Sequence, residues 1–99
     1  MINKDKSIKI VMEKFREIEN PDYPFAINES ETITKPYGWV YFYNSKKNFE
    51  TREFRYRLAG NGPVIVNKFT SELTLCGSAK DPEEYIRDYE KGLPLNQLS

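Results

Sequence analysis

Apolar residues near the start of the chain recur with the spacing of a helix. Five of them are separated by three, one, three and three positions: Ile8, Val11, Met12, Phe15 and Ile18. Side chains at these spacings share one stripe of an α-helix. The pattern predicts a helix from Asp5 to Glu19 whose stripe covers a sheet. Asn20-Pro21 ends it, because the residue before a proline is disfavoured in helical conformation.

The middle of the chain has the pattern of short strands. Five segments are rich in β-branched or aromatic residues and are bounded by Gly, Pro, Asn or Ser: Phe25–Ile33, Trp39–Tyr43, Arg52–Leu58, Pro63–Lys68 and Glu72–Cys76. Their short connections favour antiparallel pairing. The charged run Asn44–Glu50 is interpreted as a solvated hairpin loop. Gly60-Asn61-Gly62-Pro63 is interpreted as a turn, because a phosphate-binding loop would continue into a lysine and a helix.

A second helix is predicted near the end of the chain, at Pro82–Lys91. Asp81 can cap it, with Glu84 completing a capping box, and Gly92 can stop it. An apolar stripe follows the same period: Tyr85, Ile86 and Tyr89. Residues 93–99 show no periodicity and are predicted to form a loosely ordered tail.

Together these elements predict an α+β fold in one domain that spans residues 1–99, with its core at about residues 5–92. We expect a single antiparallel sheet of four to five strands, with the N-terminal and C-terminal helices packed on one face. A chain of 99 residues is long enough for one hydrophobic core and too short for two independent ones.

Charge and cysteine content narrow the function. The chain has 15 basic and 15 acidic residues, so no net charge draws it towards a polyanion or a membrane. Its one cysteine, Cys76, lies in an apolar alternation, as expected of a reduced thiol. The start of the sequence lacks the apolar run of a signal peptide or a membrane helix. We therefore expect a cytoplasmic protein that does not bind membranes.

Catalysis is not indicated. There is no histidine to act as a base, and the sole thiol is expected to be buried. No segment has the acidic spacing of a calcium loop. Glu29 and Glu31 could share a strand face like paired glycosidase carboxylates, but such a pair is more often a solvated edge. We expect no enzymatic activity, no catalytic residues, no cofactor and no metal site.

The strongest candidate for a binding surface is a pair of strands. In one of them Phe54, Tyr56 and Leu58 alternate with Arg55 and Arg57, so the apolar set is predicted to face the core. The arginines would then point outward.

In the neighbouring predicted strand, Trp39–Tyr43, the residues on both faces are apolar. If Val40 and Phe42 face the core, Trp39, Tyr41 and Tyr43 lie outward beside the arginines, a composition typical of binding hot spots. In the alternative, Trp39 and its set form the core while Val40 and Phe42 pack under a loop. The partner-binding candidates are Tyr41, Tyr43, Arg55 and Arg57, with Trp39 as a supporting or core residue.

Three motifs resemble the immunity protein 35 family, also called YrhB-like domains. They are Gly38-Trp39-Val40-Tyr41-Phe42-Tyr43, then Tyr56-x-Leu58-x-Gly60-Asn61-x-Pro63-x-x-Val66-x-Lys68-x-Thr70, and finally Tyr85-x-x-x-Tyr89-Glu90. The resemblance extends from Ile8 to Gly92. Ser71 is a departure, because a glycine is expected after the threonine.

The resemblance implies a small cytoplasmic bacterial α+β protein without catalytic residues. It implies that the chain binds and inhibits a cognate toxin of a polymorphic toxin system. Toxins with peptidase domains are associated with some members of the family. The alternatives are a small chaperone-like protein or a module for single-stranded nucleic acid, in which aromatic rings beside Arg55 and Arg57 stack on bases. Zero net charge argues against nucleic acid. The oligomeric state stays open.

Overall fold

The computed structural model describes residues 1–19, 21–52 and 62–99. Within these ranges the elements are, in chain order, α1 (Lys4–Ile18), β1 (Phe25–Ile27), the 3-10 helix η1 (Glu29–Glu31), β2 (Ile33–Lys35), β3 (Gly38–Tyr41), β4 (Tyr43–Ser45), α2 (Lys46–Thr51), β5 (Val64–Asn67), β6 (Leu73–Leu75), α3 (Pro82–Lys91) and the 3-10 helix η3 (Leu95–Gln97). The α+β class is confirmed. None of these helices is long and apolar enough to cross a bilayer.

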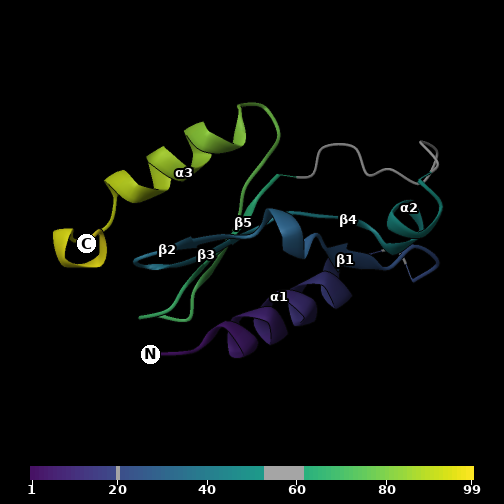
Figure 1. Cartoon of the computed structure of the whole chain (residues 1–99), viewed down its shortest axis with the longest axis horizontal. Helices are drawn as coiled ribbons and strands as arrows, with labels where there is room; N and C mark the ends of the chain where they lie inside the picture. Colours follow the sequence, from purple (N-terminus) through teal and green to yellow (C-terminus); the bar gives the residue numbers. More distant parts are fainter. Residues whose placement is uncertain (20, 53–61) are drawn as a thin grey trace.

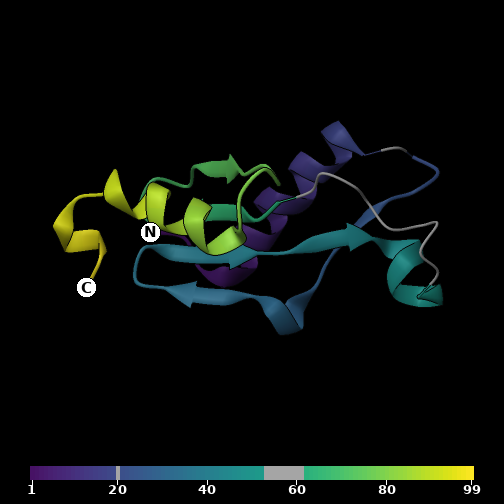
Figure 2. The same ribbon diagram turned by 90° about the horizontal axis from the view of Figure 1, so that it is seen from above.

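The described strands form two antiparallel sheets, so the prediction of a single sheet is wrong. One sheet has the order β2-β3-β5-β6, and the other pairs β1 with β4. β3 leads directly into β4, with a break at Phe42 (Figure 2). η1 interrupts the predicted strand Phe25–Ile33 opposite that break, where the Asn28 N–H donates to the Phe42 carbonyl at 2.7 Å. The interruption divides one long hairpin between two sheets.

The first helix is confirmed within one residue at each end. Asn3 caps it, because its side-chain oxygen accepts the Lys6 N–H at 2.9 Å. Val11 and Phe15 are buried as the stripe predicts, whereas Ile18 is 43% exposed. The apolar face of α1 therefore ends one turn earlier than the sequence pattern.

The two long helices cover opposite faces of the four-stranded sheet (Figure 1), so the prediction that both pack on one face is wrong. On the α1 side the buried side chains are Val11, Phe15, Trp39, Tyr41, Val64 and Val66. On the α3 side they are Tyr37, Val40, Ile65 and Ile86. Successive side chains of a strand point to opposite faces. β3 and β5 are apolar on both faces, and each face requires its own cover.

The C-terminal helix has the predicted bounds but not the predicted cap. The backbone carbonyl of Asp81 accepts the Glu84 N–H at 2.9 Å, while the Asp81 side chain makes no capping hydrogen bond. The capping box is therefore wrong.

Asn67 connects the sheet to α3 and to the tail. Its Oδ1 accepts the N–H groups of Phe69 and Thr70 at 2.8 and 3.1 Å. Its Nδ2 donates to the Tyr89 hydroxyl at 3.3 Å and to Gln97 Oε1 at 2.9 Å. The amide is 2% exposed, and a buried amide is stabilising when its donors and acceptors are paired. The contact with Gln97 holds a tail segment that the sequence pattern left without structure.

Ser71 has a φ of 65°, at the position where the family resemblance expects glycine. The left-handed conformation costs a non-glycine residue about 1–2 kcal/mol, and the greater chain entropy of glycine offsets part of any gain. We expect Ser71→Gly to raise the free energy of unfolding by about 0.5–1 kcal/mol. Urea denaturation measures it. Ser78→Gly, at an exposed residue without positive φ, is the control and should not stabilise. A less stable Ser71→Gly variant would contradict the expectation.

Candidate partner-binding site

Tyr41 is a core residue, so its predicted outward facing is wrong. It is completely buried against α1. The Ser7 hydroxyl donates to the Lys4 carbonyl at 2.6 Å, so the Tyr41 hydroxyl donates to Ser7 Oγ. Burial raises the pKa of Tyr41. Trp39 is 8% exposed in the same core, as the alternative interpretation of this strand expected.

Tyr43 has a different position. Its ring lies 4.7 Å from Phe15 and 5.3 Å from Phe25, measured between ring centroids, and its other surface lines a cleft. Burial raises the pKa of Tyr43, so its phenol stays neutral over the physiological range. It is the one sequence-predicted candidate that the described residues place at a surface hollow.

The remaining candidates, Arg55 and Arg57, lie outside the described residues, as do Phe54, Tyr56 and Leu58. Their predicted contact with the Trp39–Tyr43 segment is therefore not tested. Arg52, at the start of that predicted strand, ends α2 in a left-handed conformation with φ of 59°. The described neighbours of β3 are β2 and β5.

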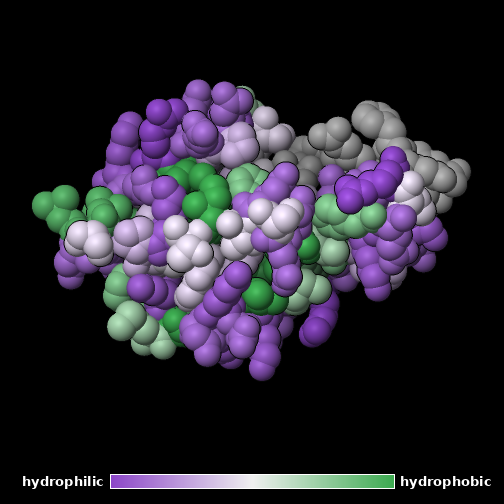
Figure 3. All heavy atoms as spheres, viewed as in Figure 1, coloured by the Kyte–Doolittle hydropathy of each residue, from purple (hydrophilic) through white to green (hydrophobic). Residues whose placement is uncertain are grey.

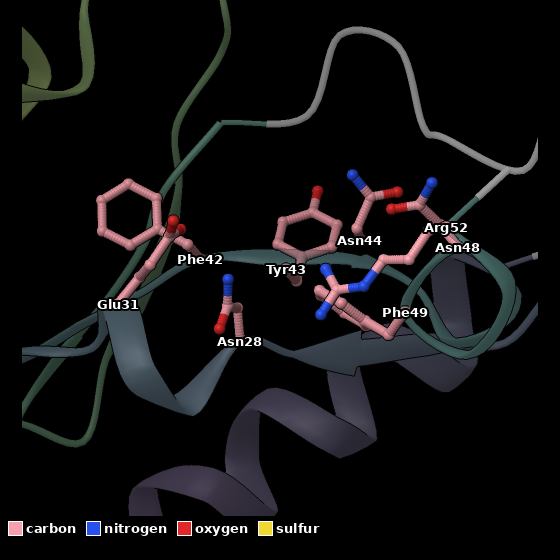
Figure 4. A pocket seen from close by; sticks show the side chains of 8 residues that line it. All are labelled: Asn28, Glu31, Phe42, Tyr43, Asn44, Asn48, Phe49 and Arg52. Carbon is pink, nitrogen blue, oxygen red and sulfur yellow. The ribbon is translucent and has the colours of Figure 1, made fainter. Parts of the chain in front are cut away.

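The aromatic cleft lies where η1, β4 and α2 meet, and has a volume of about 340 Å³ (Figure 4). Eight residues line it: Asn28, Glu31, Phe42, Tyr43, Asn44, Asn48, Phe49 and Arg52. Glu31 lies at the Phe42 end, and Arg52 lies at the opposite end beside Phe49.

One wall of the aromatic cleft is a helix that sequence analysis assigned to a loop. The predicted loop Asn44–Glu50 is instead the end of β4 followed by α2. Ser45 caps α2, since its hydroxyl oxygen accepts the Asn48 N–H at 3.1 Å. A helix of six residues is too short for a periodic apolar stripe, and Phe49 is its one aromatic. The cap at Ser45 was the available signal.

The cleft combines the groups that protein interfaces use. Three aromatic side chains provide apolar surface: Phe42, Tyr43 and Phe49. Three asparagine side chains add polar amide groups: Asn28, Asn44 and Asn48. Arg52 adds a planar donor group that is frequent in hot spots. In the described part of the chain, no three His, Cys, Asp or Glu side chains gather in a way that could hold a metal ion.

Most described motif residues stabilise the fold and do not line the cleft. Glu90 accepts the Tyr37 hydroxyl at 2.9 Å and pairs with Lys35 at 3.3 Å, which fastens α3 to the sheet. The Tyr85 hydroxyl accepts the Ala79 N–H at 3.1 Å. Phe42 and Tyr43 are the motif residues that reach the cleft.

The stretch of the chain that matches known proteins includes the residues of both cores and of the cleft. Residues 5–90 match the family described as Immunity protein 35. The uncharacterized protein YrhB of Escherichia coli (strain K12) is 34% identical over 73 residues, which are 74% of this chain and 76% of YrhB. No solved structure gives a significant match. The family match covers most of the chain, and the similarity to YrhB extends over 74% of it. This protein therefore belongs to the immunity protein 35 family.

Proposed function

We propose that this protein neutralises a cognate bacterial toxin by binding it in a stoichiometric complex, without enzymatic activity of its own. Membership of the immunity protein 35 family over residues 5–90 carries the proposal. We place the protein's action in the reducing cytoplasm, where the single cysteine, Cys76, stays a free thiol. We treat residues 1–99 as one domain, because both cores share the central strands β3 and β5.

The aromatic cleft is the proposed docking site for the toxin. Tyr43 is held in place by its ring contacts with Phe15 and Phe25, so a partner does not need to order it. Phe49 and Arg52 project from the short helix α2 on the opposite wall (Figure 4). An aromatic or arginine anchor in a pocket that excludes water contributes about 2 kcal/mol or more to a complex.

The described surface offers less to nucleic acid. The cleft contains one arginine and one glutamate, so their charges cancel. Binding of single strands depends on a positively charged groove that follows the phosphates. The aromatic cleft therefore favours a protein partner.

Co-expression with the toxin encoded next to this gene tests the function. Cells that produce both proteins are expected to grow, and cells that produce the toxin alone are expected to die. The resemblance implies toxins with peptidase domains, and neither comparison names a toxin. An assay of the neighbouring toxin for peptidase activity therefore checks this class. Equal killing with and without this protein would contradict the proposal.

Phe49→Ala tests the aromatic cleft. We expect it to weaken the complex with an inactivated toxin by about 2 kcal/mol, because it removes an aromatic anchor. Phe69→Ala is the matched control. Phe69 is 41% exposed on the turn between β5 and β6, and its loss should change affinity by less than about 0.5 kcal/mol. Calorimetry of both variants, with their melting temperatures, gives the comparison. Equal affinities for the two would place the interface away from the cleft.

A further inference from the structure

Two further hollows lie beside the aromatic cleft, between β2 and α3. The larger has a volume of about 420 Å³ and shares Phe42 with the cleft. The smaller, of about 270 Å³, shares Ile33, Glu83 and Ile86 with the larger. We call these two hollows the α3 groove. Phe42 therefore lies between the α3 groove and the aromatic cleft and lines both.

The floor of the α3 groove is apolar. Ile33 is 37% exposed, and Phe42 and Ile86 lie beside it. Figure 3 shows hydrophobic side chains gathered between α3 and β2, with hydrophilic side chains around them. Among the described strands, β2 is at the edge of its sheet. A contiguous apolar patch at a sheet edge, rimmed by polar groups, is typical of a contact surface.

The rim of the α3 groove is acidic at the end near Phe42. Asp81 and Glu83 line this end, and Glu31 lies across Phe42 in the aromatic cleft. None of the three carboxylates forms an ion pair with a described residue. The nearby lysines are already paired, Lys35 with Glu90 and Lys80 with Asp88.

The side chain of Asp81 is an acidic group of the rim that a partner can reach within the groove. An aspartate that precedes a helix usually accepts a backbone N–H with its side chain. Here the side chain makes no such bond and lines the groove. Its carboxylate is therefore available to a cation that enters the groove. Arg87 provides positive charge at the opposite end, in the smaller hollow.

We propose that the α3 groove binds an extended segment of the toxin in which a lysine or arginine adjoins an apolar residue. This inference rests on the proposed function and specifies the chemistry of the partner. The apolar residue lies on Ile33 and Ile86. The aliphatic stem of the basic residue lies across the Phe42 ring, and its charged head meets Asp81 and Glu83. Charge complementarity is the reason to assign a basic segment.

Charge neutralisation tests the rim. The probe is the inactivated toxin that co-expression identifies. We expect the double variant Asp81→Asn with Glu83→Gln to bind about tenfold more weakly, with a smaller dependence of affinity on salt. The control, Glu13→Gln with Glu72→Gln, removes the same charge from exposed positions outside the groove and should stay within about twofold of the parent.

Replacing one apolar side chain with alanine on each edge of the four-stranded sheet tests the floor of the α3 groove. Ile33 on β2 and Leu75 on β6 are 37% and 39% exposed, so replacing either with alanine removes a similar exposed apolar side chain. Ile33→Ala is expected to weaken binding about tenfold, because the side chain is buried by the toxin segment. Leu75→Ala is expected to leave affinity within about twofold. Melting temperatures confirm that each variant is folded.

The outcomes separate this inference from the proposed function. If the parent protein neither protects cells nor binds the toxin, the function is wrong. If the parent binds but the Asp81/Glu83 variant and Ile33→Ala bind as tightly as their controls, the function stands and the α3 groove is overturned. Loss in Ile33→Ala with unchanged affinity and salt dependence in the charge variant would overturn the basic segment.

Discussion

Replacing Gly38 with alanine is expected to lower the free energy of unfolding by about 4 kcal/mol or more, the largest effect that we predict. Gly38 has φ of 151°, which side chains rarely adopt. A Cβ atom there would lie 1.9 Å from the Val66 carbonyl oxygen. Gly38 pairs with Asn67 where β3 and β5 meet, so the two central strands would have to separate.

Gly92→Ala is the matched control. Gly92 has φ of −88°, and a Cβ there would have the Tyr89 carbonyl oxygen as its nearest contact, at 3.6 Å. We expect its free energy of unfolding to change by less than about 1 kcal/mol. Thermal and urea unfolding of both variants give the comparison. Equal stabilities would show that the close approach of β3 and β5 does not constrain residue 38.

Replacing Phe15 with alanine is expected to cost about 3–4 kcal/mol. The ring is completely buried on α1. It lies 5.4 Å from Phe25 and 4.7 Å from Tyr43, measured between centroids. Truncation would leave a cavity and remove both ring contacts, which add to the loss from burial alone.

Ile18→Ala provides the control for this prediction. Ile18 belongs to the same sequence stripe but is 43% exposed. Its truncation should cost less than about 1 kcal/mol. Urea denaturation measures both. If the two variants lose equal stability, the assignment of Phe15 to the core and of Ile18 to the surface is wrong. Because Phe15 supports Tyr43, its loss should also weaken toxin binding.

Helices could be predicted well wherever a period or a terminus was clear. α1 has about three turns of apolar spacing, from Ile8 to Ile18, and α3 has a proline at its start and a glycine after its end. The short helix α2 has neither. Its lysines and asparagine resemble a loop, and its cap at Ser45 is a single local signal. The wall of the aromatic cleft was therefore missed.

Sheet architecture was harder to predict. The face to which a strand side chain points depends on which helix covers each side of the sheet. Trp39–Tyr43 is apolar on both alternate sets, so the sequence pattern allowed either set to face the core. The structure buries Tyr41 under α1 and Val40 under α3. The expectation of one covered face led directly to the wrong facing of Tyr41. The division of the sheet at Phe42 has no signal in strand propensity.

The candidate site was predictable in part. Tyr43 was a candidate and lines the cleft, while Phe42, expected either in the core or under a loop, reaches it as well. Phe49 escaped notice because α2 was assigned to a loop, and Arg52 because it was placed at the start of a strand and not at the end of that helix. The α3 groove joins β2 to α3, which are separated along the chain. Contacts of that kind depend on tertiary packing and leave no local pattern.

Titration of the purified protein into the neighbouring toxin tests the central claim most directly, with inactivated toxin for the binding measurement and active toxin for the activity measurement. Toxin neutralisation by binding predicts a saturable one-to-one complex, and a toxin activity that falls in proportion to the immunity protein added. The complex should also elute as one species on a sizing column. Absence of binding at micromolar concentrations, with toxin activity unchanged by an excess of this protein, would contradict the account.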